Sequence, residues 1–129
     1  MAKTIKQTII FKGAPKEVYD YLADAKKHAK LIGGKVKMTA KAGDRFTAYG
    51  GAIEGQNLVL EPGAKIIQTW RYADWPKGHY SVALYELKKA GKNTVLNFTQ
   101  VSVPDDKAAD IAQGWKDYYW EPLKKLLDK

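Results

Sequence analysis

The sequence predicts an α+β fold in which a curved antiparallel sheet of about six or seven strands wraps around one long C-terminal helix. From Asp105 to Leu127 the apolar residues recur at steps of three and four, which is the spacing of one stripe on a helix. The chain ahead of it supplies about six alternating, strand-like segments joined by turns that contain glycine. A stripe of about five helical turns must be covered, and in a chain of 129 residues only a curved sheet can cover it.

Length and composition indicate a single domain, residues 1–129, with a hydrophobic core. Hydrophobic residues make up 45% of the chain and charged residues 28%, which is ordinary globular usage and excludes a disordered or collagenous chain. The sequence has no cysteine, no charged-then-apolar leader at Met1, and no apolar run of about 18 residues. We therefore expect a soluble cytoplasmic protein that neither spans nor binds a membrane.

The first part of the chain is expected to form a strand followed by two short helices. Residues 4–12 alternate between apolar and polar side chains, as in a half-buried strand. Pro15 suits the first position of a helix, where its missing amide hydrogen would be unpaired anyway. A bend near Asp24 separates this helix from a second one, which ends at the Gly33-Gly34 pair.

Short strands follow, and we expect them over residues 36–40, 45–49, 53–60, 65–72, 79–87 and 93–101. No crossover of helical length separates the late strands, so they should pair antiparallel with their neighbours. The long helix is expected to start at Pro104-Asp105-Asp106 with an aspartate cap. We also expect a kink at Pro122, because proline inside a helix removes a hydrogen bond and costs about 3 kcal/mol.

The formal charge of +8 marks a basic protein, and only two of its 22 basic residues are arginines, Arg45 and Arg71. Arginine suits bidentate recognition of phosphate or guanine, whereas lysine is a hydrated point charge. The charge therefore favours a diffuse attraction to an acidic surface, and net charge alone does not choose between protein, nucleic acid and membrane. Because arginine is so scarce, we expect no nucleic-acid partner.

Patterns for catalysis and metal binding are missing from the sequence. The absence of cysteine excludes thiolate nucleophiles and zinc–thiolate sites. His28 and His79 lack partners at ligand spacing, and we interpret both as surface or turn residues, with a catalytic base as the weaker alternative. Glu54 and Glu86 lie in expected strands, where alternation lets either face water. We therefore expect no enzymatic activity, no cofactor and no metal.

A lysine cluster stands out in the first half of the chain, and no acidic residue interrupts it before Asp44. Its members are Lys26, Lys27, Lys30, Lys35, Lys37 and Lys41. The cluster is either a solvated face without a function or a docking face for an acidic partner. In the second case the charges would speed encounter in a salt-sensitive way.

Aromatic residues gather on the strand 65–72, its loop and the next strand: Trp70, Tyr72, Trp75, Tyr80 and Tyr85. We expect most of them to pack against the long helix. Trp75 lies in a loop beside Pro76 and Lys77, and we expect it to be displayed on the surface as a binding anchor.

Three segments carry a family resemblance: TWRYADWPKGHY from Thr69 to Tyr80, Val103-Pro104, and GWKDYYWEPLKKL from Gly114 to Leu126. Together they resemble the C-terminal domain of the activator of the heat-shock protein 90 ATPase, across essentially the whole chain. The Gly-Trp pair is shared with the broader START-like, helix-grip superfamily, whereas the other combinations are more specific. The resemblance implies a helix-grip fold and a role in binding the chaperone during the stress response.

The resemblance also implies contact with the chaperone's N-terminal, nucleotide-binding region. The positions that match the family pattern are Trp70, Arg71, Trp75, Pro76, Gly78, His79, Gly114, Trp115, Tyr118 and Tyr119. Gly114 is expected to let the helix approach the sheet closely, with Trp115 filling that contact. The full activator has a separate N-terminal anchoring domain, whereas here Met1 immediately precedes the first strand, so strong ATPase stimulation is not expected.

Two hypotheses of function result. In the first, the chain is a stand-alone, co-chaperone-like module that binds heat-shock protein 90 through Trp75, Pro76, Lys77, His79, Lys26, Lys27, Lys30, Lys35 and Lys37. In the second, it binds, transports or cyclises a small hydrophobic ligand in a cavity between sheet and helix. Residues expected to line that cavity, or to fill the core instead, are Phe46, Trp70, Tyr72, Tyr85, Phe98, Trp115 and Tyr119. Their bulk favours a filled interior and thus the first hypothesis.

Overall fold

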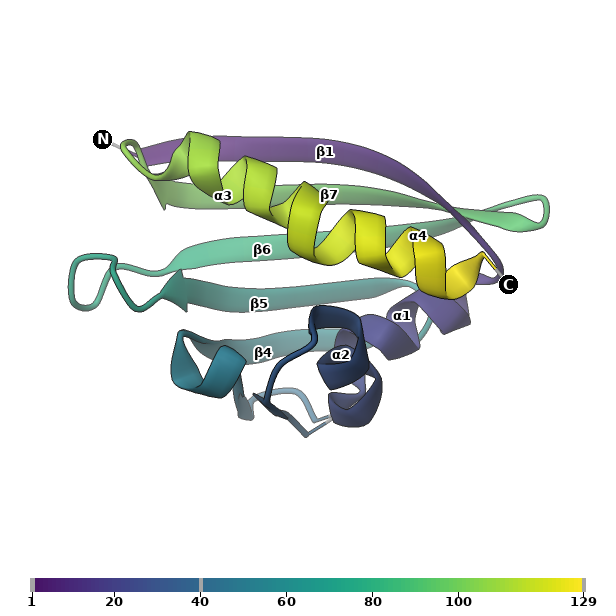
Figure 1. Cartoon of the computed structure of the whole chain (residues 1–129), viewed down its shortest axis with the longest axis horizontal. Coiled ribbons are helices and arrows are strands. Elements are labelled where there is room, and N and C mark those ends of the chain that lie inside the picture. Colours follow the sequence, from purple (N-terminus) through teal and green to yellow (C-terminus); the bar gives the residue numbers. More distant parts are fainter. Residues whose placement is uncertain (1, 40, 129) are drawn as a thin grey trace.

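The computed structural model describes residues 2–39 and 41–128 and shows one antiparallel sheet with a long helix across it (Figure 1). The sheet has seven strands in the order β1-β7-β6-β5-β4-β3-β2. Its strands are β1 (Ala2–Lys12), β2 (Val36–Lys37), β3 (Arg45–Ala48), β4 (Ile53–Glu61), β5 (Lys65–Tyr72), β6 (Ser81–Ala90) and β7 (Asn93–Pro104). All six neighbouring pairs are antiparallel, which confirms the predicted fold class.

Two short helices follow β1, as predicted: α1 (Pro15–Ala23) and α2 (Ala25–Ile32). Asp24 makes the bend between them with an extended backbone, and its carboxylate accepts a hydrogen bond from the Lys27 amide at 3.0 Å. This bond satisfies one of the free amides at the start of α2. Gly33 ends α2 in the left-handed conformation that glycine adopts without strain.

The strand boundaries differ from the expected ones mainly at the sheet edge. β2 ends at Lys37, and Ala40, which closes the expected strand, lies outside the described residues. β7 runs on to Pro104, because Ala2 of β1 still pairs with Pro104 there. The chain then makes a turn before the helix, in which the Lys107 amide donates to the Pro104 carbonyl at 3.0 Å.

The long helix consists of α3 (Ala108–Trp115), a π-helical turn η2 (Lys116–Trp120) and α4 (Glu121–Leu127). Its N-cap residue is Lys107, whose side chain forms no capping hydrogen bond, so the helix begins after the predicted Pro104-Asp105-Asp106 start. The irregularity predicted at Pro122 falls one turn earlier, where the Glu121 amide donates to the Lys116 carbonyl. A wider turn directly before Pro122 accommodates a residue that has no amide hydrogen to offer.

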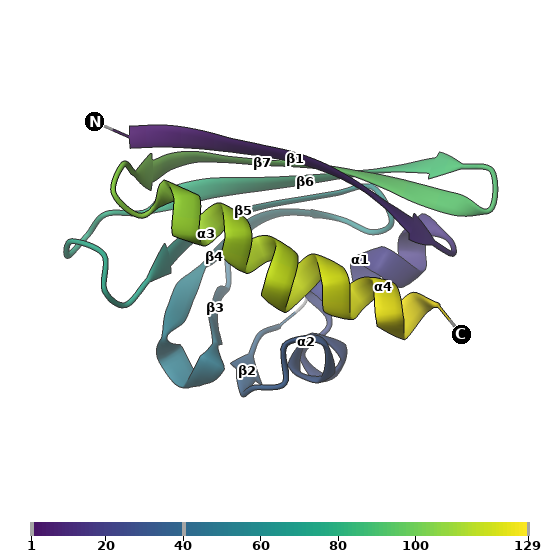
Figure 2. The same ribbon diagram turned by 45° about the horizontal axis from the view of Figure 1, so that its top comes forward.

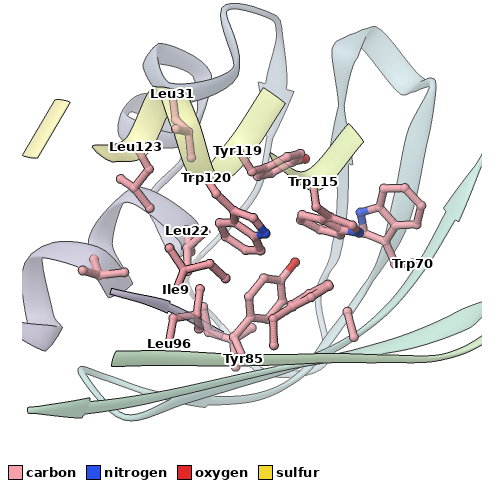
Figure 3. Packing of buried hydrophobic residues seen from close by; sticks show 14 of the residues in the cluster. Ile9, Leu22, Leu31, Trp70, Tyr85, Leu96, Trp115, Tyr119, Trp120 and Leu123 are labelled. Atoms are coloured by element: carbon pink, nitrogen blue, oxygen red, sulfur yellow. The ribbon is translucent and has the colours of Figure 1, made fainter. Parts of the chain in front are cut away.

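The sheet curves around the helix, and Figure 2 shows β3 and β2 brought round toward the side on which the helix lies. Figure 3 shows Trp115, Tyr119 and Trp120 projecting from the helix toward Tyr85 of the sheet. All four side chains are at most 5% exposed, so the core forms between helix and sheet as predicted. Within the described part of the chain, no helix is long and apolar enough to cross a bilayer.

Close contact inside the sheet depends on Gly55 in β4. A Cβ atom at this position would lie 1.8 Å from the Thr69 carbonyl oxygen and 2.9 Å from the Phe46 ring. Only glycine fits between β3 and β5 here, as expected for a glycine inside a strand where another backbone approaches closely. Gly55 pairs with Trp70 of β5, whose side chain lines the pocket between the sheet and the long helix.

Candidate functional site

A pocket of about 640 Å³ lies between the first half of the C-terminal helix and one end of the sheet. Its lining residues are Tyr49, Ala52, Ile53, Trp70, Tyr72, Asp74, Trp75, Lys107, Asp110, Ile111, Gly114, Trp115, Tyr118 and Tyr119. The pocket opens to solvent, because Tyr72 and Tyr118 are 38% and 61% exposed. The expectation that large side chains fill the interior is therefore wrong at this end of the molecule.

The floor of the pocket is a packed group of aromatic rings centred on Trp115. The Trp115 ring lies 5.5 Å from the Trp70 ring and 4.4 Å from the Tyr119 ring, measured between centroids. Figure 3 shows Trp70 of the sheet beside Trp115 of the helix. Tilted and edge-on ring pairs at these distances are favourable and hold each ring in one orientation, so the floor is preformed.

A buried chain of hydrogen bonds fixes Trp115 to the sheet. The Trp115 indole nitrogen donates to Gln100 Oε1 at 2.8 Å, and Gln100 Nε2 donates to Ser81 Oγ at 2.9 Å. The Ser81 hydroxyl donates in turn to the Trp70 carbonyl at 2.7 Å. Gln100 and Ser81 are fully buried, so these bonds satisfy groups that would be costly to leave unpaired.

Trp75 forms one wall of the pocket and is not displayed, since its side chain is only 4% exposed. The Arg71 guanidinium donates to the carbonyls of Trp75 at 2.8 Å and of Pro76 at 3.3 Å. It also lies 5.8 Å from the Tyr80 ring centroid. Arg71 thus satisfies carbonyls of the loop between β5 and β6 and turns Trp75 inward, where its ring meets Trp70 edge-on at 5.5 Å.

The three residues that follow Trp75 in this loop are accessible. Pro76, Lys77 and Gly78 are exposed. His79 is half-buried and its Nε2 atom donates to the Ser102 carbonyl at 2.8 Å. The loop therefore exposes Pro76 and Lys77 to solvent, whereas Trp75 is buried beneath them.

Charged residues stand at the edge of the pocket. Lys107 Nζ forms an ion pair with Asp74 Oδ2 at 3.1 Å, and the hydrogen bond to this carboxylate raises the pKa of Lys107. Asp110, one turn further along α3, is exposed and forms no ion pair with another residue of the described part of the chain. The pocket thus combines an aromatic interior with a charged rim.

The lysine cluster is exposed at all five positions proposed as a docking face: Lys26, Lys27, Lys30, Lys35 and Lys37. Among the described residues, no acidic side chain forms an ion pair with any of the five. Figures 1 and 2 both place α2 away from the loop between β5 and β6, with the 3₁₀ turn η1 (Tyr49–Gly51) between them. The cluster and the Trp75 loop therefore do not form one continuous surface.

His28 is buried, which contradicts its interpretation as a surface or turn residue. Its Nδ1 atom donates to the Tyr21 carbonyl at 3.1 Å, and its ring lies 5.6 Å from the Tyr119 ring. Burial lowers the pKa of His28 to about 4, because the charged form loses its hydration. His28 does not line the pocket, so it supports the core.

Of the predicted cavity residues, Trp70, Tyr72, Trp115 and Tyr119 line the pocket, whereas Phe46, Tyr85 and Phe98 pack in the core. Gly114 also lines the pocket, and a Cβ atom there would meet only the Tyr118 ring, at 3.8 Å. The expectation that Gly114 permits a close approach of helix and sheet is therefore wrong. No group of three potential metal-ligating side chains occurs among residues 2–39 and 41–128.

Sequence reasoning missed the pocket residues Tyr49, Ala52, Ile53, Asp74, Lys107, Asp110 and Ile111 as a group. One signal for Tyr49 was present in the sequence, because the Gly50-Gly51 pair that follows it marks a tight turn. In the structure Tyr49 adopts a positive φ of 52° in this turn. Ile111 lies on the predicted helical stripe three residues before Gly114. The remaining residues belong to segments that are far apart in the sequence and meet only in the folded chain.

Comparison with known proteins identifies the family of this fold and pocket. The family model described as "Activator of Hsp90 ATPase homolog 1-like protein" matches residues 12–128. The chain belongs to this family. The match spans the first helix pair, the whole pocket and the C-terminal helix, and it confirms the resemblance seen in the sequence motifs.

Two curated members of the activator family are similar over nearly all of this chain. The activator of 90 kDa heat shock protein ATPase homolog of Dictyostelium discoideum is 33% identical over 123 residues, which are 95% of this chain and 32% of that protein. Homolog 2 of Mus musculus is 26% identical over 121 residues, 94% of this chain and 37% of that protein. The chain thus spans about a third of the length of these relatives.

A solved structure shares the complete fold. It is described as an HSP90 activator from Plasmodium falciparum, and it superimposes with a TM-score of 0.92 at 20% sequence identity. The match covers 97% of this chain and 96% of the other. At 20% sequence identity, this likeness shows a shared fold and not a shared activity.

Proposed function

We propose that this activator-family domain binds a heat-shock protein 90-type chaperone and modulates its ATPase. The observation that carries the proposal is the match of the activator-family model to residues 12–128, which include the pocket and the C-terminal helix. The solved structure described as an HSP90 activator from Plasmodium falciparum supports the proposal at the level of the fold. The family membership and the curated names of the similar proteins support the same conclusion.

The docking face that we propose is the lysine cluster on α2 and the segment leading into β2. Its five lysines are exposed and lack ion-pair partners among the described residues, so they are available to an acidic surface. Charges of one sign on a small surface accelerate encounter and make binding sensitive to salt. Pro76, Lys77 and His79 form a second, smaller contact region that Arg71 positions.

The proposed role is binding, without catalysis and without a cofactor. Of the two histidines, His28 packs in the core and His79 is bonded to a backbone carbonyl. We also propose that the protein works in the cytoplasm. The chain has no cysteine and so forms no disulfide, which is typical of proteins in a reducing compartment.

The test is a pull-down with the full-length chaperone, combined with its ATPase assay, at low and at physiological salt. The variant Lys26→Glu/Lys27→Glu/Lys30→Glu should lose binding. A matched control, Lys88→Glu/Lys89→Glu/Lys92→Glu, makes the same change in net charge at the exposed end of the β6–β7 hairpin and should retain most of it. Absence of binding by the unmodified chain at about micromolar concentration would end the proposal.

The pocket favours a second function, the binding of a small, largely apolar molecule. Its volume of about 640 Å³ lies within the range of about 300–1,000 Å³ that is usual for small-molecule sites. Thermal-shift screening with lipids and with aromatic polyketides tests it, because a ligand that binds only the folded state raises the melting temperature. A library without any hit would count against this function and would leave the chaperone proposal untouched.

A further inference from the structure

We propose that the pocket selects a small aromatic cation, such as a planar aromatic amine, over a neutral or anionic molecule of the same shape. This inference rests on the second function proposed above and names the ligand class for that pocket. It depends on three features: the aromatic lining, the unpartnered Tyr49 hydroxyl at the wall, and the charge at the rim.

The lining offers aromatic rings rather than aliphatic side chains. Seven of the fourteen lining residues are aromatic, and only Ile53 and Ile111 are branched aliphatic residues. The face of an aromatic ring carries partial negative charge, so rings that surround a cation stabilise it, most strongly when the rings are those of tryptophan. Trp70, Trp75 and Trp115 all contribute to the lining, which makes it better suited to a cation or an aromatic ring than to an alkyl chain.

Two buried polar atoms at the pocket wall lack a partner. The Tyr49 hydroxyl and the Trp75 indole nitrogen form no hydrogen bond within the described residues. A buried polar group without a partner costs about 1–3 kcal/mol. The Tyr49 oxygen is an available acceptor for an ammonium N–H group, and Tyr49 lies at the edge of the sheet, across from the rim residues of α3. The Trp75 N–H group is a donor only, so it forms no hydrogen bond with an ammonium group and does not contribute to the selectivity.

The rim has the opposite sign of charge to the protein as a whole. Its charged residues are Asp74, Asp110 and Lys107, so two negative charges and one positive charge leave −1. The whole chain carries +8. Lys107 is already paired with Asp74 at 3.1 Å, whereas Asp110 has no ion pair within the described part of the chain. An entering anion would meet no free basic group at the pocket, and an entering cation would meet the free carboxylate of Asp110.

Calorimetric titration with three probes of matched shape tests the selectivity at physiological salt. The probes are 2-naphthylmethylammonium, 2-naphthylmethanol and 2-naphthoate. We expect the ammonium probe to bind at least about threefold more tightly than the alcohol, and the carboxylate to bind most weakly. The net charge of the protein works against this order, so long-range attraction cannot produce it.

Three single substitutions separate the rim from the rest of the surface. Asp110→Asn should weaken the affinity for the ammonium probe by about threefold and leave the affinity for the alcohol unchanged. Lys107→Gln removes a positive charge from the rim and should therefore strengthen binding of the ammonium probe. The control Asp128→Asn makes the same change as Asp110→Asn at the far end of the long helix, where Asp128 pairs with Lys12, and should change neither probe.

Equal binding of ammonium and alcohol, or strongest binding of the carboxylate, would overturn this inference while leaving a ligand-binding pocket in place. Failure of all three probes to bind at about millimolar concentration would overturn both the inference and the second function. An unchanged affinity of Asp110→Asn for the ammonium probe would show that the Asp110 charge does not stabilise the bound cation, which would contradict the proposal.

Discussion

Trp115 stacks on Trp120 with ring centroids 5.4 Å apart and ring planes 17° from parallel, although five positions separate the two residues. In an uninterrupted α-helix, residues five positions apart point about 140° away from each other. The π-helical turn η2 removes much of this divergence, so both rings reach the sheet. Their indole nitrogens then donate to different strands, Trp115 to Gln100 of β7 and Trp120 to Gln7 of β1.

Truncation of Trp115 should destabilise the protein more than any surface change. Trp115→Ala removes a side chain that is 2% exposed and leaves the buried Gln100 oxygen without its donor. We expect a loss of about 3–5 kcal/mol in the free energy of unfolding, measured by urea denaturation. Tyr118→Ala, at a position 61% exposed on the same helix, should change it by less than about 1 kcal/mol. Similar losses in both variants would contradict the central role of Trp115.

Two glycine substitutions should differ sharply although each adds a single methyl group. Gly55→Ala places Cβ 1.8 Å from the Thr69 carbonyl oxygen, so the strands must separate. We expect a loss of about 3 kcal/mol or more. In Gly114→Ala the nearest atom is 3.8 Å away, and alanine favours a helix over glycine by about 1 kcal/mol. Thermal unfolding of both variants provides the comparison, and a destabilised Gly114→Ala would show that the helix lies closer to the sheet than described.

Stability should fall between pH 6.5 and pH 4 because of His28. The folded state lowers the pKa of His28 from 6.5 to about 4, so within this interval the unfolded chain binds a proton that the folded chain does not. The free energy of unfolding therefore decreases as the pH falls through this interval, by up to about 3 kcal/mol, and this contribution is constant above pH 6.5. Urea titrations of the unmodified protein and of His28→Gln across this range measure how the free energy of unfolding depends on pH. The dependence should be weaker in His28→Gln. The same pH dependence in both proteins would show that the pKa of His28 is not lowered by folding.

Arg71 should control the order of the loop between β5 and β6. Its Nη2 atom donates to two loop carbonyls, and this atom lies one bond further from the backbone than the ammonium nitrogen of lysine, which therefore falls short of them. We expect Arg71→Lys to increase hydrogen exchange of the amides from residue 73 to 79 by about tenfold and to shift tryptophan emission to longer wavelength as Trp75 meets water. Arg45→Lys, which changes an exposed arginine paired with Glu54, should do neither. An unchanged loop in Arg71→Lys would mean that Trp75 is held by its ring contacts alone.

The architecture was predictable because it follows from local periodicity. The stripe through Ile111, Trp115, Tyr119 and Leu123 requires a covering sheet, and the strands from β2 to β7 pair with their neighbours along the chain. The pairing of β1 with β7 joins distant segments and does not follow from local periodicity. Asp24 and Gly33 were predictable for the same reason, since capping and the left-handed conformation depend on residues nearby in the sequence.

The site was less predictable because it depends on contacts between distant segments. Trp75 has the local sequence of an exposed loop, whereas the hydrogen bonds of Arg71 to the loop carbonyls and the contact with the Trp70 ring hold it inward. The pocket exists because Gly114, Ile111 and the turn at Tyr49 leave space that the large rings of Phe46, Tyr85 and Phe98 do not fill. Residue volumes alone therefore predicted a filled interior.

Binding to the chaperone is the most direct test of the proposed function. Titration of the chain into full-length heat-shock protein 90, followed by calorimetry, should give a dissociation constant of about 10 μM or lower at low salt. The affinity should fall at physiological salt, and it should fall by roughly tenfold or more in Lys26→Glu/Lys27→Glu/Lys30→Glu. The absence of a binding signal for the unmodified chain at low salt, or equal affinity of the lysine variant, would contradict the account.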